Sequence, residues 1–342
     1  MQQEIKILPI SAELYPAYYN MVQQTTWGNP MLPTAYNNKL WGDVLLLENQ
    51  MIGGWVGTIR GDIPVARFIT KSVYFDSYPI FANVSDEQKY IDDLIFAIKQ
   101  HAKKERVVML NLTHWVREGK LSLDAEHLGA SFISQLHTTE ECLWGQVESK
   151  QRNCIRKGQK SGVEVFAYQA EEALKYLDDF QILRQRTQQH AIRNHAQASM
   201  LLKSNRYFHE LFLNPNATLF IAVVESKVAA VALMLQSGST VYYYSGGSDY
   251  ELNKKYSCSA LLIWKAMLYY NEHGLSIFDM GGVPVSPTKE HPAYGVYAFK
   301  RSFGGEYREF DGGQIIIAPR KYKLLQFFLS QRKLLRLLSK KL

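Results

Sequence analysis

The spacing of apolar side chains predicts alternating helices and strands along the first half of the chain. Apolar residues three and four positions apart predict helices over residues 11–24 and 86–104. Runs rich in Val, Ile and aromatic residues predict strands over residues 43–48, 51–60, 64–75 and 106–112. The resulting order is helix, three strands, helix, strand, which is typical of an α/β module.

The same order recurs in the second half. Strands are predicted over residues 219–224, 227–236 and 240–246, followed by a helix over 257–272 that Gly274 ends and a buried strand over 275–280. Met51–Gly54 corresponds to Lys227–Ala230 at an offset of 176 residues. We therefore predict a duplicated module of about 150–170 residues, with a ligand cleft shared by its two copies. Three further helices are predicted between the copies, over residues 150–160, 171–190 and 199–213.

Composition agrees with two domains. The chain has 342 residues, of which 46% are hydrophobic, enough for an ample core. Its formal charge of +7 is unevenly placed: eight of the 39 basic residues lie in 320–342, without an acidic residue, and five lie in 150–160. Outside these two stretches the chain is mildly acidic. This distribution argues against a surface that coats polyanions generally.

Several classes of protein lack their sequence signals. The three cysteines are widely spaced and odd in number, which favours a reducing compartment. No apolar run approaches the roughly 18 residues of a membrane span, and the N-terminus has no signal-peptide core. There is no G-x-S-x-G elbow, P-loop, G-x-G-x-x-G or H-E-x-x-H motif, so we predict no metal site and no resident cofactor.

Glycine-rich segments follow two strands of the second module. Tyr242–Asp249 reads Y-Y-Y-S-G-G-S-D, and Asp279–Gly282 reads D-M-G-G after a buried strand. These segments place backbone amides and a carboxylate at strand ends. Further on, Phe299-Lys300 precedes Phe303-Gly304-Gly305, so a lysine beside glycines is positioned to meet an anionic ligand.

In these segments the chain resembles the Fem (FemABX) family of non-ribosomal peptidyltransferases, which use aminoacyl-tRNA to add amino acids to peptidoglycan precursors. The resemblance also includes Arg152–Val165 (R-N-C-I-R-K-G-Q-K-S-G-V-E-V) and Trp264 through Gly274. It implies two tandem GNAT-like domains, each a mixed and mainly antiparallel sheet flanked by helices. The compact type without a helical arm is the better match. We place the domains at residues 1–148 and 149–318, with a basic amphipathic helix over 319–342 that the family packs on the first domain.

The sequence departs from the family pattern in two places. The first module has Tyr74–Pro79 in place of a Pro- and Gly-rich precursor-binding segment, and His190 stands where the family's T-x-x-R pattern has arginine. No site residue is therefore assigned in the first module.

The resemblance implies a catalytic role for Lys300, in which its charge stabilises the tetrahedral intermediate or the leaving tRNA end. The alternative is a surface lysine on the last hairpin. Asp279 either orients and deprotonates the attacking amine or caps the glycine turn that follows it. Substrate binding is predicted for Tyr244, Phe299, Gly281 and Gly282, although Tyr244 has the alternative of a strand residue in the core.

Two basic helices offer further contacts. Arg152, Arg156 and Lys160 recur every four residues, and this face suits phosphates of the precursor or of the tRNA acceptor end, or is merely solvated. In residues 319–342 one side is apolar, including Leu324, Phe327 and Phe328, and the opposite side is basic. That helix either packs its apolar side on the first module or rests on anionic lipid.

Three functions remain open at this level. The first is an aminoacyltransferase that moves an amino acid from aminoacyl-tRNA to a peptidoglycan precursor, UDP-linked or lipid-linked, in forming interpeptide bridges. The second is an acyl-CoA-dependent N-acyltransferase using acetyl-CoA or a related donor, and the third is a non-catalytic scaffold of cell-wall synthesis. The expected location is the cytoplasm, with peripheral contact at the inner face of the membrane as an open alternative.

Overall fold

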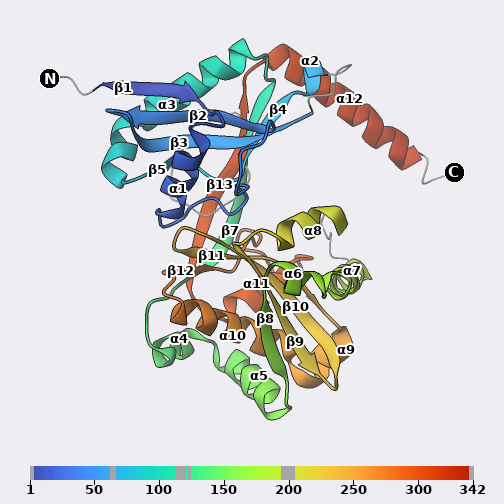
Figure 1. The fold of residues 1–342 in the computed structure, drawn as a ribbon. Coiled ribbons are helices and arrows are strands. Elements are labelled where there is room, and N and C mark those ends of the chain that lie inside the picture. Colours follow the sequence, from blue (N-terminus) through green and yellow to red (C-terminus); the bar gives the residue numbers. More distant parts are fainter. Residues whose placement is uncertain (1–3, 62–66, 113–120, 122–124, 194–204, 339–342) are drawn as a thin grey trace. The chain divides into compact units, whose positions relative to one another are not determined.

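The computed structural model describes residues 4–61, 67–112, 121, 125–193 and 205–338, and the chain forms two compact units (Figure 1). The first unit consists of residues 1–25, 31–127 and 310–342, and the second of residues 26–30 and 128–309. Among the described helices, none combines the length and apolar character that crossing a membrane requires.

The first unit has one sheet with helices on it. Its elements are β1 (Ile5–Pro9), α1 (Tyr15–Gln23), β2 (Leu40–Leu47), β3 (Gln50–Arg60), α2 (Arg67–Thr70), β4 (Ser72–Phe75), β5 (Ile80–Phe81), α3 (Val84–Lys104), β6 (Met109–Leu112) and α12 (Pro319–Leu338). The strand order is β1-β2-β3-β4-β6-β13, where β13 (Glu306–Ile316) comes from the far part of the sequence, and only the β4–β6 pair is parallel. One core cluster joins the sheet to α3, and a second joins it to α1.

The second unit repeats this sheet. Its elements are β7 (Ala125–Gln135), α4 (Glu140–Gln146), α5 (Ser149–Lys160), β8 (Glu164–Tyr168), α6 (Ala170–Leu174), α7 (Leu177–Arg193), α8 (Asn205–Phe212), β9 (Ala217–Val224), β10 (Lys227–Ser237), β11 (Thr240–Ser248), α9 (Tyr250–Tyr256), α10 (Cys258–Glu272), β12 (Ile277–Asp279), α11 (Tyr294–Arg301) and β13 (Glu306–Ile316). The strand order is β8-β9-β10-β11-β12-β7, in which only the β11–β12 pair is parallel.

The two sheets agree in detail, as a duplication requires. The turn between β2 and β3 has positive φ at Glu48 and Asn49, and the turn between β9 and β10 has positive φ at Glu225 and Ser226. Positive φ at both central residues is the requirement of a type I′ hairpin. Each hairpin also shifts register two to three residues further on, past Ile52 in β3 and past Ala229 in β10. These features align the copies at an offset of 177, one residue away from the offset of 176 predicted from Met51–Gly54.

Each sheet is completed by a strand from the far part of the sequence. In the first unit, β6 pairs with β13 through Gly313–Ile316. In the second unit, β12 pairs with β7 through Ile133–Gln135. The chain therefore exchanges the last strand of each module. For this reason residues 128–148 group with the second unit and residues 310–318 with the first, which differs from the predicted boundaries.

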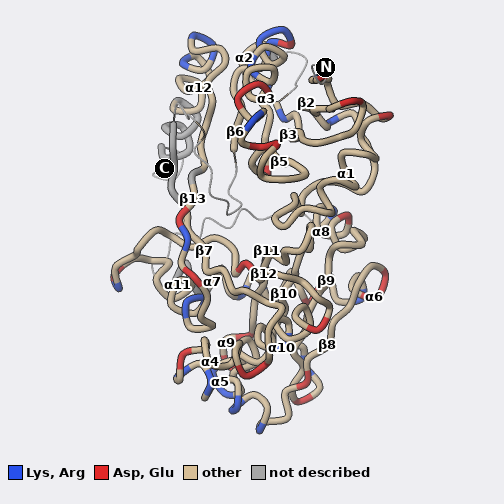
Figure 2. Tube along the Cα trace, turned by 90° about the vertical axis from the view of Figure 1, so that its left-hand side faces the viewer, with Lys and Arg blue, Asp and Glu red and all other residues tan. Residues whose placement is uncertain are grey.

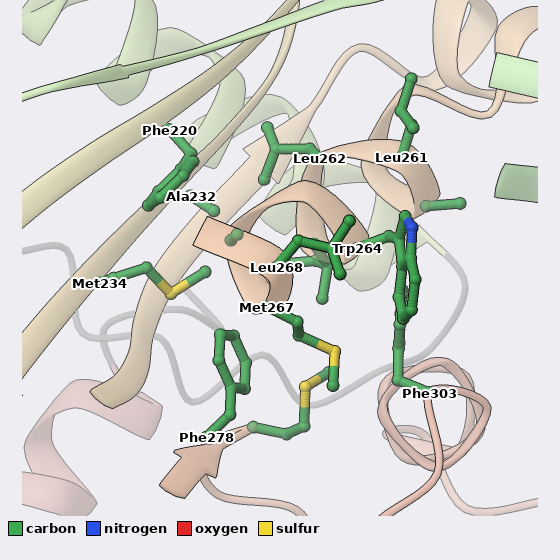
Figure 3. Close-up of a cluster of buried hydrophobic side chains, with 14 of the residues drawn as sticks. Phe220, Ala232, Met234, Leu261, Leu262, Trp264, Met267, Leu268, Phe278 and Phe303 are labelled. Atoms are coloured by element: carbon green, nitrogen blue, oxygen red, sulfur yellow. The ribbon is translucent and has the colours of Figure 1, made fainter. Parts of the chain in front are cut away.

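The core of the second unit lies between its sheet and α10 (Figure 3). Phe220, Ala232 and Met234 project from β9 and β10 toward Leu262, Met267 and Leu268 of α10, and Phe278 of β12 joins them. Trp264 extends toward Phe303, just beyond α11. This core holds β11, β12 and α11 in place, and these elements, with the glycine turn after β12, carry six of the nine predicted site residues.

A short loop from the first half of the chain also belongs to the second unit. Residues 26–30 lie against β10 and β11: Thr240 Oγ1 donates to the Thr26 carbonyl (2.7 Å), and the Asn29 amide donates to Ser237 Oγ (2.9 Å). The Tyr242 hydroxyl donates to the Trp27 carbonyl. No pattern in the sequence indicates this attachment.

Two predicted elements were wrong in part. Residues 64–75 were predicted as one strand, but residues 67–70 form α2 and only Ser72–Phe75 is a strand, while 62–66 lie outside the described residues. Thr70 Oγ1 donates to the Gly61 carbonyl (2.5 Å), which closes a turn where a strand was expected. The helix predicted over 171–190 is divided into α6 and α7 near Tyr176, whose ring stacks on Tyr168.

Helix α12 presents several of its described large apolar side chains to solvent. It contacts α2 within the first unit, and Tyr322 donates to Gln314 Oε1 (2.6 Å). Leu325 is buried, whereas Leu324, Phe327 and Phe328 are exposed. The expectation that the side with Leu324, Phe327 and Phe328 packs on the first module was therefore wrong for these residues. The side chains beyond Ser330 lie outside the described part of the helix.

Candidate active site

The candidate site lies where β11 and β12 stop pairing. Their parallel register runs from Thr240–Ile277 to Tyr242–Asp279 and ends there. Asp279 is the last residue of β12 and is only 1% exposed. The neighbouring strand β7 brings Ser131 to the same point, where Ser131 Oγ donates to Asp279 Oδ1 (2.5 Å).

Asp279 holds the glycine turn. Its Oδ1 also accepts from the Gly281 amide (2.7 Å), while Oδ2 is buried without a hydrogen-bond partner among the described residues. Burial raises the pKa of the Asp279 carboxyl, and the hydrogen bonds from Ser131 and Gly281 together with the charge of Lys300 oppose that rise. This geometry matches the turn-capping alternative. A role for Asp279 in deprotonating an amine stays a prediction.

Gly281 requires the absence of a side chain. Its φ is +72°, and a Cβ there would lie 2.5 Å from the Tyr243 carbonyl oxygen and 3.4 Å from Lys300 Nζ. Gly282 is exposed, and a Cβ on it would meet nothing within 4 Å. The turn therefore brings its backbone close to β11 at Gly281 and leaves Gly282 open.

Lys300 lies on helix α11 and is 9% exposed, so the alternative of a surface lysine on a hairpin was wrong, and the catalytic role stays a prediction. Its Nζ donates to the Gly282 carbonyl (3.2 Å) and lies 5.4 Å from the centre of the Tyr243 ring. Burial lowers the pKa of Lys300 to about 8, and the charge of Asp279 opposes that shift. At neutral pH the ammonium form prevails, held by one carbonyl and one aromatic face.

Of the other predicted substrate-binding residues, Phe299 faces the core and Tyr244 contacts α8. Phe299 is partly buried and packs edge-on against Phe303 at 5.2 Å, so it supports α11 from the core side. Tyr244 lies at an irregularity of β11, where the register with β10 steps from Tyr243 to Ser245. A bulge of this kind re-aims a side chain. The Tyr244 hydroxyl shares a hydrogen bond of 2.5 Å with Tyr207 of α8.

The basic face of α5 extends away from α11, the helix that carries Lys300. Arg152 donates weakly to the Trp144 carbonyl (3.5 Å), and the Arg156 guanidinium lies 5.2 Å from the Trp144 ring. Figure 2 shows the basic residues along α5. Glu148, just before α5, pairs with Arg301 (3.0 Å), so the helix begins beside the end of α11, and Lys160 lies roughly 16 Å further along.

Sequence reasoning missed Ser131 and Tyr243 as neighbours of Asp279 and Lys300. Ser131 lies in the first half of the chain, 148 residues before Asp279, and only the strand exchange brings them together. Tyr243 was named only as part of a tyrosine run; burial raises its pKa to about 12, so its phenol stays protonated near neutral pH. His190, the departure from the family pattern, has a side chain outside the described set.

Two units with this strand order, each a mixed sheet flanked by helices, define a tandem GNAT-like protein. Residues 216–329 match the FemAB family. They include Asp279, Gly281, Gly282 and Lys300. The chain thus has a GNAT-like fold and is similar to the FemAB family over about a third of its length.

Individual proteins are similar to parts of the chain or to its fold. Lipid II:glycine glycyltransferase of Staphylococcus aureus is 34% identical over 73 residues, which is 21% of this chain and 17% of that protein. The match thus spans about a sixth of the length of the curated relative. A crystal structure of FemX superposes with a TM-score of 0.69 at 15% identity, covering 93% of this chain and 99% of FemX. The C-terminal domain assigned to a lysylphosphatidylglycerol synthetase of Agrobacterium fabrum has a TM-score of 0.50 at 13% identity, with 76% and 80% covered. The two structures show the shared fold.

Proposed function

We propose that this protein is an aminoacyltransferase that moves an amino acid from aminoacyl-tRNA onto the peptide of a peptidoglycan precursor, as in interpeptide bridge formation. The observation that carries the proposal is the buried ammonium of Lys300 beside the open Gly282, within the segment that matches the FemAB family. The glycyltransferase name of the Staphylococcus aureus relative supports the substrate class.

The reaction needs positioning and charge stabilisation more than a nucleophilic side chain. The precursor amine attacks the ester carbonyl carbon of the aminoacyl-tRNA and forms a C–N bond. The C–O bond to the tRNA ribose then breaks, the amine loses a proton, and the ribose hydroxyl gains one. Because the ester is already activated, a deprotonated amine held close to it suffices.

Lys300 is assigned the role of stabilising the negative charge that develops in this reaction. Its ammonium has three N–H donors, of which one reaches the Gly282 carbonyl. The others are suited to the tetrahedral oxygen or to the leaving ribose oxygen, and in a buried site such donors act more strongly than in water. Ser131 and Asp279 act through the glycine turn as positioning residues.

The test measures transfer with purified protein. Charged tRNA and radiolabelled acetyl-CoA are each supplied as donor, with UDP-linked and lipid-linked precursors as acceptors. The proposal is supported if Lys300→Met lowers transfer from charged tRNA by at least 100-fold. Lys265→Met, which changes an exposed residue of α10, is the control and should leave transfer unchanged. Transfer from acetyl-CoA alone replaces it with an N-acyltransferase, and transfer from neither donor favours the cell-wall scaffold.

The tRNA contact is assigned to the basic face of α5. Arg156 and Lys160 are exposed, with no carboxylate within ion-pair distance of either among the described residues. Phosphates of an acceptor stem suit such a face, whereas an amino acid ester alone does not need it.

Membrane contact is assigned to α12. Phe327 is 57% exposed and Phe328 50%, and exposed Arg320 and Lys323 lie on the same helix. Aromatic side chains with neighbouring cations suit the interface of an anionic bilayer. The full chain should float with phosphatidylglycerol vesicles, and Phe327→Ser/Phe328→Ser should abolish flotation. Phe96→Ser, which changes an exposed phenylalanine of α3, is the control; equal flotation of all three proteins would reject the contact.

A further inference from the structure

A buried arginine in the second unit has no acidic partner. Arg184 of α7 is 6% exposed, and no carboxylate lies within ion-pair distance of it among the described residues. Its Nε donates to Ser245 Oγ (2.8 Å) and its Nη1 donates to Gln181 Oε1 (3.1 Å), both uncharged acceptors. Burial lowers the pKa of Arg184, but a guanidinium stays charged at any physiological pH. A buried charge of this kind is costly unless an anion compensates it.

The surroundings of Arg184 provide further hydrogen-bond donors. Gln181 is also 6% exposed, and its Nε2 has no hydrogen-bond partner among the described residues, although its Oε1 is bound to Arg184. The guanidinium lies 4.3 Å from the centre of the Phe208 ring, and Tyr207 precedes Phe208 on α8. Tyr207 and Tyr244 share their hydroxyl hydrogen bond here, and both tyrosines are partly exposed.

The fold holds these groups together. Helix α7 packs on β10 and β11. The backbone of α7 comes so close to Gly247 of β11 that a Cβ on Gly247 would lie 2.6 Å from the backbone nitrogen of Arg184. The register step in β11 places Ser245 beneath the guanidinium and Tyr244 beside Tyr207. A cation and an amide donor thus lie in the interior, and two partly exposed phenols lie near the cation.

From this arrangement we infer that Arg184, Gln181 and the Tyr207–Tyr244 pair form a binding site for an oxyanion, a phosphate or a carboxylate group of a ligand. The anion accepts from the guanidinium and from Gln181 Nε2, and it supplies the charge that the interior lacks. The site does not include Lys300, which lies against the ring of the neighbouring Tyr243. Under the proposed function, the oxyanion belongs to the acidic precursor or to the tRNA.

The test uses small anions and needs no enzymatic activity. Thermal unfolding of the full chain is followed with inorganic phosphate, pyrophosphate and acetate at millimolar concentrations and constant ionic strength. If phosphate and pyrophosphate raise the unfolding midpoint temperature by a few degrees and acetate does not, the site binds phosphate. If acetate raises the midpoint temperature and the phosphates do not, the site binds carboxylate. A midpoint that no anion moves would overturn the inference.

Gln181→Glu is the decisive variant because it should fold. A carboxylate at this position lies next to Nη1 of Arg184 and acts as an internal counter-ion. The variant is expected to unfold at a higher temperature than the wild type without anion, and to lose the response to the active anion. Arg186→Gln on the same helix, whose partner Asp249 is outside the cluster, should keep the wild-type response.

Two outcomes separate this inference from the proposed function. In the first outcome, anions stabilise the protein, Gln181→Glu abolishes this stabilisation, and the protein shows no transfer activity. This outcome supports the anion site and rejects the transferase. Transfer from charged tRNA, with an anion response that Gln181→Glu leaves intact, supports the transferase and overturns the site. Tyr244→Phe gives an independent measure and should weaken anion binding several-fold by removing one hydroxyl.

Discussion

At the scale of single residues, the buried lysine is the most consequential side chain. Lys300 forms one hydrogen bond to a carbonyl and lies against one aromatic ring, and its pKa is lowered to about 8 because its charged form is desolvated. Such a lysine weakens the fold at neutral pH. A lysine that lowers stability is retained in the interior when its ammonium group serves catalysis.

Replacing the lysine should therefore stabilise the protein while it abolishes transfer. For Lys300→Met we expect a gain of about 1–3 kcal/mol in the free energy of unfolding at pH 7, since one pKa unit corresponds to about 1.4 kcal/mol. Because the folded pKa lies below the unfolded one, wild-type stability rises with pH between about 8 and 10.5, and the gain shrinks over that range. Urea unfolding of both proteins at pH 7 and pH 9.5 measures it. A destabilised variant would show that the lysine serves the fold.

The pH dependence of transfer should report the same group. The ammonium of Lys300 is the active form, so kcat should fall as pH rises through about 8, while deprotonation of the attacking amine sets the rise at lower pH. The measurement is a pH–rate profile with charged tRNA and precursor. A rate that keeps rising beyond pH 9 contradicts the assigned role.

The glycine turn gives a matched pair of variants. Gly281→Ala forces a positive φ on alanine and puts its Cβ against the Tyr243 carbonyl, so it should cost about 2 kcal/mol or more of stability. Gly282→Ala meets open space and should change stability by less than about 0.5 kcal/mol. Equal effects in thermal unfolding would show that the turn is not held against β11.

At the scale of elements, the C-terminal end of α3 is fastened to β2 by a titratable pair. His101 Nδ1 lies 2.9 Å from Asp43 Oδ1, and the His101 ring stacks on Trp41 at 4.5 Å. Glu105, which pairs with Lys71 at 3.0 Å, lies 3.5 Å from His101 Nε2. The hydrogen bond to Asp43 and the charges of Asp43 and Glu105 raise the pKa of His101.

A raised histidine pKa fixes the sign of the pH effect. The stabilisation is fully present below the ordinary value near 6.5 and is lost as pH rises through the folded value. For His101→Gln we expect a loss of about 1–2 kcal/mol at pH 6 and a smaller loss at pH 8.5. His273→Gln, an exposed histidine stacked on Tyr269, is the control for urea unfolding at both pH values. A loss that does not depend on pH would rule out the charged pair.

The elements themselves follow closely from the apolar pattern, whereas the site does not. The strand triplets and the long helices were predictable because burial imposes periods of two and 3.6 residues on them. Helix α2 was not, because a side-chain hydrogen bond from Thr70 to Gly61 decides it. The partnership of Ser131 with Asp279 was not predictable either, because a local pattern holds no information about which distant strand lies alongside. Arg184 was overlooked because its missing carboxylate is visible only in three dimensions.

At the scale of the whole molecule, the exchange of β7 and β13 decides which fragments can fold. A fragment of residues 128–309 keeps β7 beside β12, with Ala130, Phe132 and Ile133 in the core. A fragment of residues 149–318, cut where the sequence suggests a boundary, lacks that strand and also α4, whose Leu143 belongs to the same core. Both fragments lack residues 26–30, so this loop does not distinguish them.

We expect the longer fragment to unfold cooperatively and the shorter one to remain loosely packed. Near-ultraviolet circular dichroism with thermal unfolding distinguishes these states. Equal cooperativity in both fragments would mean that β7 and α4 are dispensable for the second unit.

The same exchange also sets a schedule for synthesis on the ribosome. Strand β6 is made by residue 112, but Gly313–Ile316, which cover its edge, emerge about 200 residues later. At roughly 5–20 residues per second, that edge waits on the order of 10–40 s for its neighbour. A nascent chain with an open edge for so long is a substrate for chaperones and a seed for aggregation. Slow codons or truncation within residues 310–342 should therefore harm the first unit more than the second, although most of the first is made earlier.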